Sequence, residues 1–157
     1  MNSIDISQLA SKLRQDVKNA IEYEVFKVCE KALRDSIMET VYSGKPTSYM
    51  RTYEFLNAVK VKNVSVGHSQ AEFEITIDAS MMGLSPASAG KFGSHMGFKG
   101  QDVRDSLAGW LNDGTRGKYY LHPAHGFFEK AESGLESKIV KAMASALKGN
   151  GWDVTYM

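Results

Sequence analysis

Apolar residues recur every three to five positions near the start of the chain, which is the spacing of one face of a helix. The pattern predicts an amphipathic helix from Ile6 to about Val41, with Asp5 as its N-cap and Gly44 and Pro46 as its stop signals. The stripe consists of Leu9, Leu13, Val17, Ile21, Val25, Val28, Ala32 and Ile37. At about 1.5 Å per residue the helix is roughly 50 Å long, more than a compact domain of this size needs. We therefore expect part of it to project or to pack on a neighbouring subunit.

The pattern then changes to the alternation of a strand. In Ala71–Asp78 the residues Ala71, Phe73, Ile75 and Ile77 alternate with polar residues, which predicts a strand with one wet face. Upstream, Val59 and Val61 share one parity and Val64 and Val66 the other, so we expect a second strand with a bulge near Asn63. A turn at Gly67, His68 and Ser69 joins the two strands into a hairpin.

Between Ser80 and Gly100 the apolar residues follow neither helical nor strand spacing. This segment is rich in glycine and serine and also carries large apolar side chains. These side chains are Met81, Met82, Phe92, Met96 and Phe98. A free linker would lack them, so one interpretation is a mobile loop at 80–100 that meets an assembly partner. The other interpretation is an irregular loop packed on its own domain.

The last third of the chain predicts two further helices and a strand. A short helix carries Val103, Leu107, Trp110 and Leu111, and ends in a turn that starts at Asn112. A longer helix runs from Phe128 through Ala146 and ends at Gly149 and Gly151. Alternation of Trp152, Val154 and Tyr156 predicts a closing strand that joins the hairpin. The expected fold is α+β: a long N-terminal helix and a small antiparallel sheet, with a second helix packed on it.

Length and composition narrow the possibilities only slightly. We expect a single domain over residues 1–157. The net charge of +1 argues against a dedicated nucleic-acid binder, so any contact with DNA is expected to be local. Cys29 is the one cysteine, which excludes an intramolecular disulfide and fits a reducing cytoplasm. The evenly mixed first residues and the lack of a long apolar run predict neither a signal peptide nor a membrane span.

The stretch "HPAHGFFEKA", residues 122–131, raises the question of chemistry, because His122 and His125 stand three residues apart. A metal site would need a third ligand, and Pro123 and Gly126 place the pair in a turn rather than on one helix face. The alternative is structural: the proline rigidifies the approach, His125 or its neighbours satisfy the amides at the start of a helix, and the two phenylalanines anchor that helix. The motifs GxSxG, HExxH and GxxxxGK do not occur in the sequence, and we expect neither an enzyme nor a cofactor.

A second candidate segment is "GTRGKYY", residues 114–120. Arg116 and Lys118 stand beside Tyr119 and Tyr120, a mixture that binds phosphate and stacks on bases. A nucleic-acid-binding accessory protein is therefore one alternative function, and a small metal-dependent enzyme that uses His122 and His125 is another. An ordinary basic turn is the simpler interpretation of this segment.

Two stretches together resemble the small neck or tail-completion proteins of long-tailed phages. "YMRTYEFLNAV" is similar to the segment that follows the long first helix in that family, and "LAGWLNDGTRGKYYLHPAHGFFEKA" is similar to its aromatic helix, Gly-Thr turn and His-Pro segment before a Phe-rich last helix. The order of elements agrees over nearly the whole chain. The positions that carry the resemblance are Tyr49, Arg51, Thr52, Leu56, Asn57, Gly114, Thr115, His122, Pro123, Phe127 and Phe128.

The resemblance implies a structural subunit, made in the host cytoplasm, that joins the phage head to the tail in the virion. Its expected partners are other copies of itself in a ring, the connector or head-completion proteins, and the tail terminator or tail tube proteins. Genomic DNA would be a passing contact, and no membrane is implied. Arg51, Thr52 and Asn57 would then fix the junction between helix and sheet, Gly114 would shape a turn, and residues 122–128 would seat the last helix.

Overall fold

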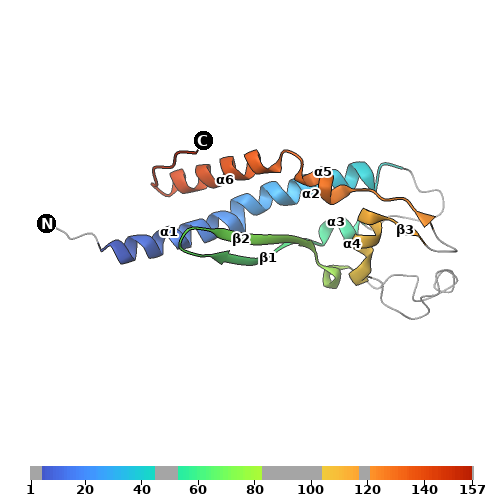
Figure 1. Ribbon diagram of the computed structural model, residues 1–157, viewed down its shortest axis with the longest axis horizontal. Coiled ribbons are helices and arrows are strands. Elements are labelled where there is room, and N and C mark those ends of the chain that lie inside the picture. The colour runs from blue at the N-terminus through green and yellow to red at the C-terminus, as the bar shows by residue number, and fades with distance from the viewer. Residues whose placement is uncertain (1–4, 45–52, 83–103, 117–120, 157) are drawn as a thin grey trace. The chain divides into compact units, whose positions relative to one another are not determined.

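The computed structural model of the protein describes residues 5–44, 53–82, 104–116 and 121–156 (Figure 1). The chain forms two compact units. Unit 1 comprises Met1–Ala32, Lys60–Thr76 and Ser133–Met157, and unit 2 comprises Leu33–Val59 and Ile77–Glu132. The described elements confirm the predicted α+β class.

The long N-terminal helix is confirmed, with one feature that the sequence did not predict. It consists of α1 (Ile6–Ala20), a π-helical turn η1 (Ile21–Val25) and α2 (Phe26–Thr40). The side chain of Asp5 caps it by accepting a hydrogen bond from the backbone N–H of Ser7 at 2.9 Å. A π turn holds more residues than an α turn, so it rotates the apolar stripe, and the consecutive residues Ala20 and Ile21 are both buried.

Strands β1 (Val59–Val66) and β2 (Ala71–Ile77) form the predicted hairpin. At its turn the N–H of Gly67 donates to the carbonyl of Gln70, and at its open end the N–H of Asp78 donates to the carbonyl of Ala58. Nine positions separate Gly67 from Ala58 but only eight separate Gln70 from Asp78, so β1 holds one extra residue.

The predicted bulge at Asn63 accounts for that residue. Asn63 has a φ of 56°, the left-handed conformation typical of one class of bulge, and its Nδ2 donates to Glu74 Oε2 at 2.8 Å. The extra residue shifts the alternation of side chains along the strand, so valines before and after the bulge face the same side. Val59 is buried and Val61, Val64 and Val66 are half-buried, although the two pairs of valines stand at opposite parities in the sequence.

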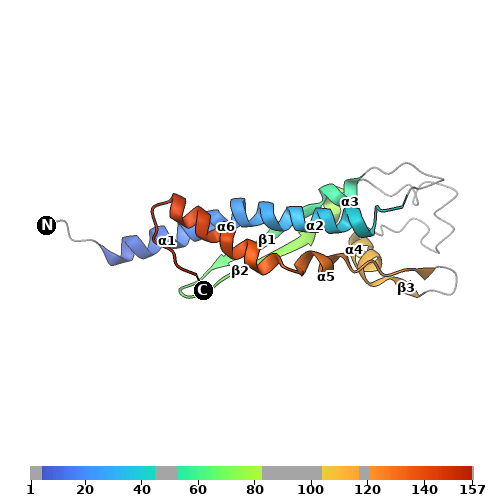
Figure 2. The same ribbon diagram turned by 90° about the horizontal axis from the view of Figure 1, so that it is seen from above.

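In unit 1, helix α6 (Leu135–Gly149) packs along α1 and η1. Both helices lie on the same side of the β1–β2 hairpin (Figures 1 and 2). The buried apolar side chains of this unit are Ala20, Ile21, Val25, Cys29, Ala144 and Leu147. Burial raises the pKa of the Cys29 thiol to about 11, so the thiol is neutral in its apolar surroundings.

The predicted C-terminal strand is wrong. Residues 152–156 form no strand, and the described sheets are two two-stranded ribbons, β1–β2 and β3–β4. The tail instead turns back over the helices: the N–H of Trp152 donates to the carbonyl of Leu147, and its indole Nε1 donates to Asp16 Oδ2 at 2.8 Å. Trp152 is thereby bound to α1, with Lys12 Nζ 5.9 Å from its ring centroid.

In unit 2, the second half of α2 is followed by α3 (Glu54–Asn57), η2 (Ala79–Met81) and α4 (Arg104–Asp113). A short antiparallel ribbon of β3 (Thr115–Arg116) and β4 (Leu121–His122) then leads into α5 (Phe127–Glu132). The buried apolar side chains of this unit are Leu33, Ile37, Phe55, Leu56, Ala58, Val59, Met82 and Phe127.

The predicted single helix from Phe128 to Ala146 is wrong in one respect, because the structure divides it into α5 and α6. The break falls at Gly134, which has a φ of +72° and stands at the N-cap position of α6. Glycine adopts this conformation without the steric cost that a Cβ would bring.

Candidate functional site

The segment that raised the question of chemistry, residues 121–128, lies in unit 2 between β4 and the start of α5. The backbone N–H groups of His125 and Gly126 both donate to the carbonyl of Asn112, at 3.1 and 3.0 Å, and that of His125 also reaches Leu111 at 3.0 Å. These carbonyls belong to the last turn of α4, where a helix leaves its acceptors without partners. The turn that enters α5 therefore satisfies the end of α4.

Asn112 completes this connection through its side chain, which is buried with 6% exposure. Its Oδ1 accepts a hydrogen bond from the backbone N–H of Phe128 at 2.9 Å, and its Nδ2 donates to Asp113 Oδ1 at 2.8 Å and to Glu129 Oε1 at 3.2 Å. The side chain of Asn112 thus caps α5, the role that the sequence assigned to His125 or its neighbours. We name the backbone and side-chain bonds of Asn112 to residues 125–129 the Asn112 junction.

Phe127 anchors the start of α5, as the structural interpretation predicts. Its side chain is fully buried and meets the ring of Phe55 edge-on, with the ring centroids 5.8 Å apart. The hydroxyl of Ser36 on α2, also buried, donates to the carbonyl of Phe127 at 2.8 Å. Phe128 is half-buried, and its ring centroid lies 4.5 Å from that of Phe127.

Sequence reasoning missed Asn112 and Ser36. The sequence predicts only a turn that starts at Asn112, because this residue precedes Asp113 and Gly114. Its bonds to residues 125–129 span a large sequence separation that no local pattern reveals. Ser36 stands beside Ile37 on the buried face of α2. A polar residue next to the apolar stripe is the sequence signal that could have identified it, because a buried polar group needs a hydrogen-bond partner.

The first half of the family motif lies partly within the described residues. Leu56 is buried in α3, and Asn57 Oδ1 accepts a hydrogen bond from the Arg34 guanidinium at 3.1 Å, which ties α3 to α2. The resemblance implied that Asn57 fixes a junction between helix and sheet, and the observed bond connects it to helix α2. Tyr49, Arg51 and Thr52 lie outside the described residues.

The remaining motif positions surround the β3–β4 ribbon. Gly114 has a φ of +78°, a conformation that favours glycine, and shapes the turn from α4 into β3. Thr115 pairs with His122 across the ribbon, and the described structure does not extend to their side chains. Pro123 is exposed after β4.

The predicted loop at 80–100 falls mostly outside the described residues, and so do Phe92, Met96 and Phe98. At its beginning, Met81 is 45% exposed, whereas Met82 is 5% exposed and belongs to the core of unit 2. The sequence predicts both methionines as parts of an interface loop, but only Met81 is exposed and Met82 is a core residue.

The residues proposed for nucleic-acid and metal chemistry are described only in part. Lys118, Tyr119 and Tyr120 lie outside the described residues, as does the side chain of Arg116. For the metal hypothesis, the described residues contain no cluster of three His, Cys, Asp or Glu side chains that would hold an ion, and the side chain of His122 is not among them. No helix in the described part of the chain is long and apolar enough to cross a bilayer.

Comparison with known proteins adds the origin of the chain. Residues 5–149 match the YomN family, which covers every described element of both units. The chain belongs to the YomN family. This family is phage-derived, so the protein is a phage-related protein. No curated protein and no solved structure matches the chain. YomN membership agrees with the phage origin that the resemblance predicted and leaves the neck or tail-completion role as a proposal.

Proposed function

We propose that the protein is a virion structural subunit that forms a ring at the joint between the phage head and the tail, as a neck or tail-completion protein. The observation that carries the proposal is the match of residues 5–149 to a phage-derived family. On the head side its partners would be connector or head-completion proteins, and on the tail side tail terminator or tail tube proteins. Genomic DNA would pass through the ring.

The roles of the motif residues support a structural function. Leu56 and Phe127 are core residues of unit 2, Asn57 ties α3 to α2, and Gly114 shapes a turn. Residues that pack, bridge elements or shape turns within their own chain are typical of a motif that maintains the fold.

The test is deletion of the gene from its phage or prophage, followed by induction and negative-stain electron microscopy of the lysate. Packaged heads that accumulate apart from finished tails are the expected result, and a plasmid copy of the wild-type gene should restore joined particles. Whole, infectious particles at normal yield would overturn the proposal. In that case DNA binding by the purified protein, weakened by added salt, would favour the nucleic-acid alternative.

A second experiment separates the two joint positions. Purified protein is incubated with isolated heads or with isolated tails from the deletion lysate, and each mixture is sedimented. Cosedimentation with heads alone would indicate a neck subunit, and cosedimentation with tails alone a tail-completion subunit. Restored infectivity after the second component is added would show that the bound protein is in its working position.

A further inference from the structure

Both strands of the β1–β2 hairpin have an outer edge beside which no described strand lies (Figures 1 and 2). Backbone groups in an antiparallel pair point alternately toward the partner strand and away from it. Gln70 and Asp78 bond to β1, so Phe73, an odd number of residues from both, directs its N–H and C=O groups outward from β2. Val61 likewise directs its backbone groups outward from β1, because Ala58 bonds inward. Each edge is a template for a further strand.

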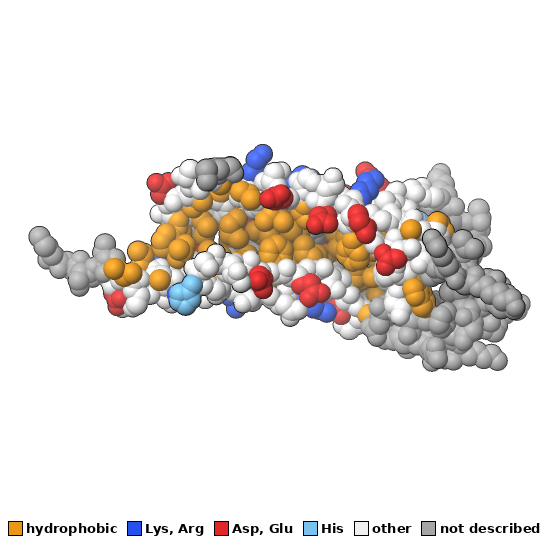
Figure 3. All heavy atoms as spheres, in the orientation of Figure 1, with side chains coloured by type: hydrophobic (Ala, Val, Ile, Leu, Met, Phe, Trp, Pro, Cys, Tyr) orange, Lys and Arg blue, Asp and Glu red, His pale blue; other side chains and the backbone are white. Residues whose placement is uncertain are grey.

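There is open space beside both edges. Along the β1 edge, a hollow of about 450 Å³ follows residues 60–64 and is bounded on its other side by Lys18, Glu22 and Phe26 of the long helix. Next to β2, hydrophobic side chains gather between the hairpin and α6 on the face drawn in Figure 3. A strand added at either edge would therefore meet apolar side chains as well as backbone groups.

The charged side chains of the hairpin lie on its other face. Val59 is buried, so the odd positions of β1 ahead of the bulge face the core of the fold and the even positions face away from it. On β2 the odd position Phe73 is half-buried, whereas both glutamates at even positions are exposed. The charged residues that face away from the core are Lys60, Lys62, Glu72 and Glu74.

The hydrogen bonds at the two ends of the hairpin fix which residues lie opposite each other within one copy. On the charged face the opposed pairs are Lys60 and Thr76, Lys62 and Glu74, and Ser65 and Glu72. Both glutamates also accept bonds from neutral amides: Asn63 Nδ2 donates to Glu74 at 2.8 Å, and Gln70 Nε2 donates to Glu72 at 3.2 Å. These amides leave the negative charges in place, and Glu72 has a neutral neighbour across the hairpin.

Charge determines which edges can pair between copies. Full antiparallel overlap of β2 with the same strand of a second copy places Glu74 opposite itself. Overlap of two β1 strands ahead of the bulge places Lys60 opposite itself or opposite Lys62. Like charges directly opposite each other are destabilising, whereas β2 beside β1 places unlike charges together. The charges therefore disfavour self-pairing of either edge and select the other strand of a second copy.

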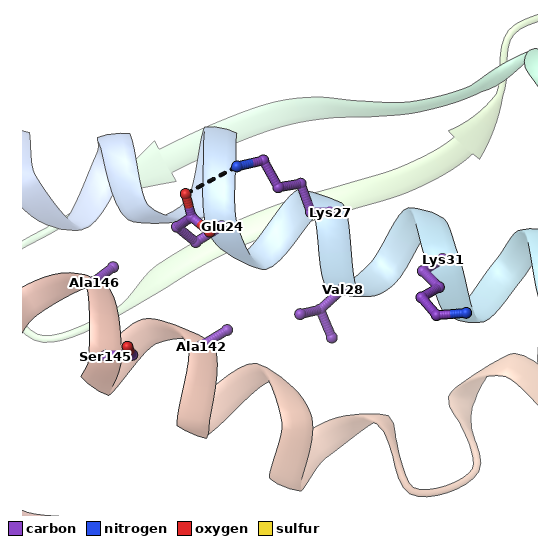
Figure 4. Close-up of a pocket in the computed structure, with 7 residues that line it drawn as sticks. All are labelled: Glu24, Lys27, Val28, Lys31, Ala142, Ser145 and Ala146. Carbon is purple, nitrogen blue, oxygen red and sulfur yellow. Dashed lines mark hydrogen bonds and ion pairs between the residues drawn. The ribbon is translucent and has the colours of Figure 1, made fainter.

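Another hollow of unit 1 carries no such selection. It measures about 470 Å³ and lies between α6 and the segment where η1 passes into α2 (Figure 4). Two of the charged residues that line it, Glu24 and Lys27, bind each other, with 3.0 Å from Nζ to Oε1. Its lining on α6 is small and uncharged: Ala142, Ser145 and Ala146. The hairpin edges, by contrast, combine outward backbone groups with charges in a defined order.

We propose that the β2 edge of one copy of the protein pairs antiparallel with the β1 edge of the next copy. Phe73 then lies opposite Val61 of the next copy, which places Glu72 opposite Lys62 and Glu74 opposite Lys60. A shift by two residues in either direction loses one of these two ion pairs. Across successive copies, each row of the charged face reads Ser65, Glu72, Lys62, Glu74, Lys60, Thr76, so glutamate and lysine alternate.

The contact is head-to-tail, because β2 of one copy meets β1 of the next and leaves one edge of each kind at the ends. Such contacts close a ring when the rotation between copies permits it, and the inference rests on the proposed function for that closure. Successive hairpins keep the same orientation, so their helices stay on one face of the shared sheet. Unit 1 supplies α1 and α6 for two strands, and α/β barrels accommodate one helix per strand outside a closed sheet.

The first test measures the mass of the full-length protein by light scattering at increasing concentration. Wild-type protein should form oligomers. Glu72→Lys and Lys62→Glu should each raise the concentration of half-assembly by about tenfold or more, because each places like charges at the contact. The matched controls Glu136→Lys and Lys138→Glu make the same changes at exposed positions of α6 and should assemble like the wild type. A wild-type protein that stays monomeric up to its highest soluble concentration would overturn the proposal.

The double variant Lys62→Glu, Glu72→Lys gives the decisive comparison. It restores unlike charges at the contact between copies, so it should assemble better than Lys62→Glu alone. Both proteins carry the same glutamate opposite Glu74 within the hairpin, and circular dichroism checks that both are folded. The comparison therefore isolates the contact between copies. Equal or weaker assembly of the double variant would overturn the proposal.

Disulfide formation tests the register directly. In a Cys29→Ala background, Glu74→Cys protein is mixed with a tagged Lys60→Cys protein and oxidised. The two positions form a pair without mutual backbone hydrogen bonds, with Cα atoms about 4.5 Å apart, so a heterodimeric disulfide should form. Glu72→Cys with Lys60→Cys is the control: these positions are diagonal, about 7–8 Å apart, and should give little product. Equal yields from the two mixtures would overturn the proposal.

The deletion experiment tests the joint function separately. A joint protein that associates through another surface would give separated heads and tails on deletion but would fail the disulfide test. A protein with no role at the joint that pairs through its hairpins would show the opposite pair of results.

Discussion

Asn112 Oδ1 accepts a hydrogen bond from the backbone N–H of Phe128 at 2.9 Å, across sixteen residues of sequence. One buried amide side chain therefore joins the end of α4 to the start of α5, the point at which the segment with two histidines becomes a helix. The Asn112 junction gives that segment an architectural role, and it is the first place to test by mutation.

Asn112→Ala should lower the free energy of unfolding by about 1–3 kcal/mol, because it removes a helix cap and leaves buried polar groups without partners. Asn150→Ala, at an exposed position after α6, is the matched control and should change it by less than about 0.5 kcal/mol. Chemical denaturation followed by circular dichroism measures both. Equal small effects in the two variants would show that the Asn112 junction does not stabilise unit 2.

Phe127→Ala should lower the free energy of unfolding by about 3–5 kcal/mol, since the ring is fully buried against Phe55 and its removal leaves a cavity. Phe128→Ala removes a half-buried ring next to it and should cost clearly less. The difference between the two midpoints of denaturation is the measurement. A Phe128→Ala protein at least as unstable as Phe127→Ala would contradict the assignment of Phe127 as the anchor of α5.

Gly134→Ala should destabilise the protein by about 1–2 kcal/mol, because a Cβ is strained at a φ of +72° even though no atom lies within 4 Å of it. Gly149→Ala, in the last turn of α6 and likewise in open space, should leave stability unchanged or raise it by up to about 1 kcal/mol. Thermal melting of the two variants beside the wild type gives the comparison. A stabilised Gly134→Ala protein would indicate that α5 and α6 form one continuous helix after all.

Native Cys29 should react slowly with a thiol reagent at neutral pH. A pKa near 11 lowers the thiolate fraction about 100-fold relative to a thiol with the ordinary value of 9.0, and burial also blocks the reagent. A Cys29→Ala, Ser11→Cys protein, whose thiol is exposed on α1, is the control and should react rapidly. Comparable rates in the two native proteins would contradict the burial of Cys29.

The same shift sets the sign of a pH effect. The pKa of Cys29 is raised in the folded chain, so its contribution to stability is fully present below pH 9 and is lost as the pH rises from about 9 toward 11. Wild-type protein should therefore lose more stability over this range than Cys29→Ala does. Parallel pH profiles for the two proteins would contradict this linkage.

The sequence predicted the elements whose signal is local. The apolar stripe from Leu9 to Ile37 indicated the long helix, and the change of parity between Val61 and Val64 indicated the bulge that Asn63 forms. Each signal depends only on neighbours within a few residues, and the side chains concerned pack as their spacing implies.

The errors come from contacts between distant residues and from one glycine. Alternation of Trp152, Val154 and Tyr156 imitates a strand, but the bond from Trp152 to Asp16 holds the tail on α1. An apolar spacing of four connects Ala131 to Leu135 across Gly134, so the pattern does not register the break in the helix. The role of Asn112 likewise becomes visible only when α4 and α5 meet.

Unit 1 is assembled from the first, a middle and the last part of the chain, and this affects the order of events during synthesis. Helix α1 leaves the ribosome before its packing partner α6 exists, and about 115 residues separate the end of α1 from the start of α6. At 5–20 residues per second, α1 waits roughly 6–23 s for that partner. Throughout that delay its apolar face is available to chaperones or to other nascent chains, so the yield of folded protein should depend on translation speed over the middle of the message.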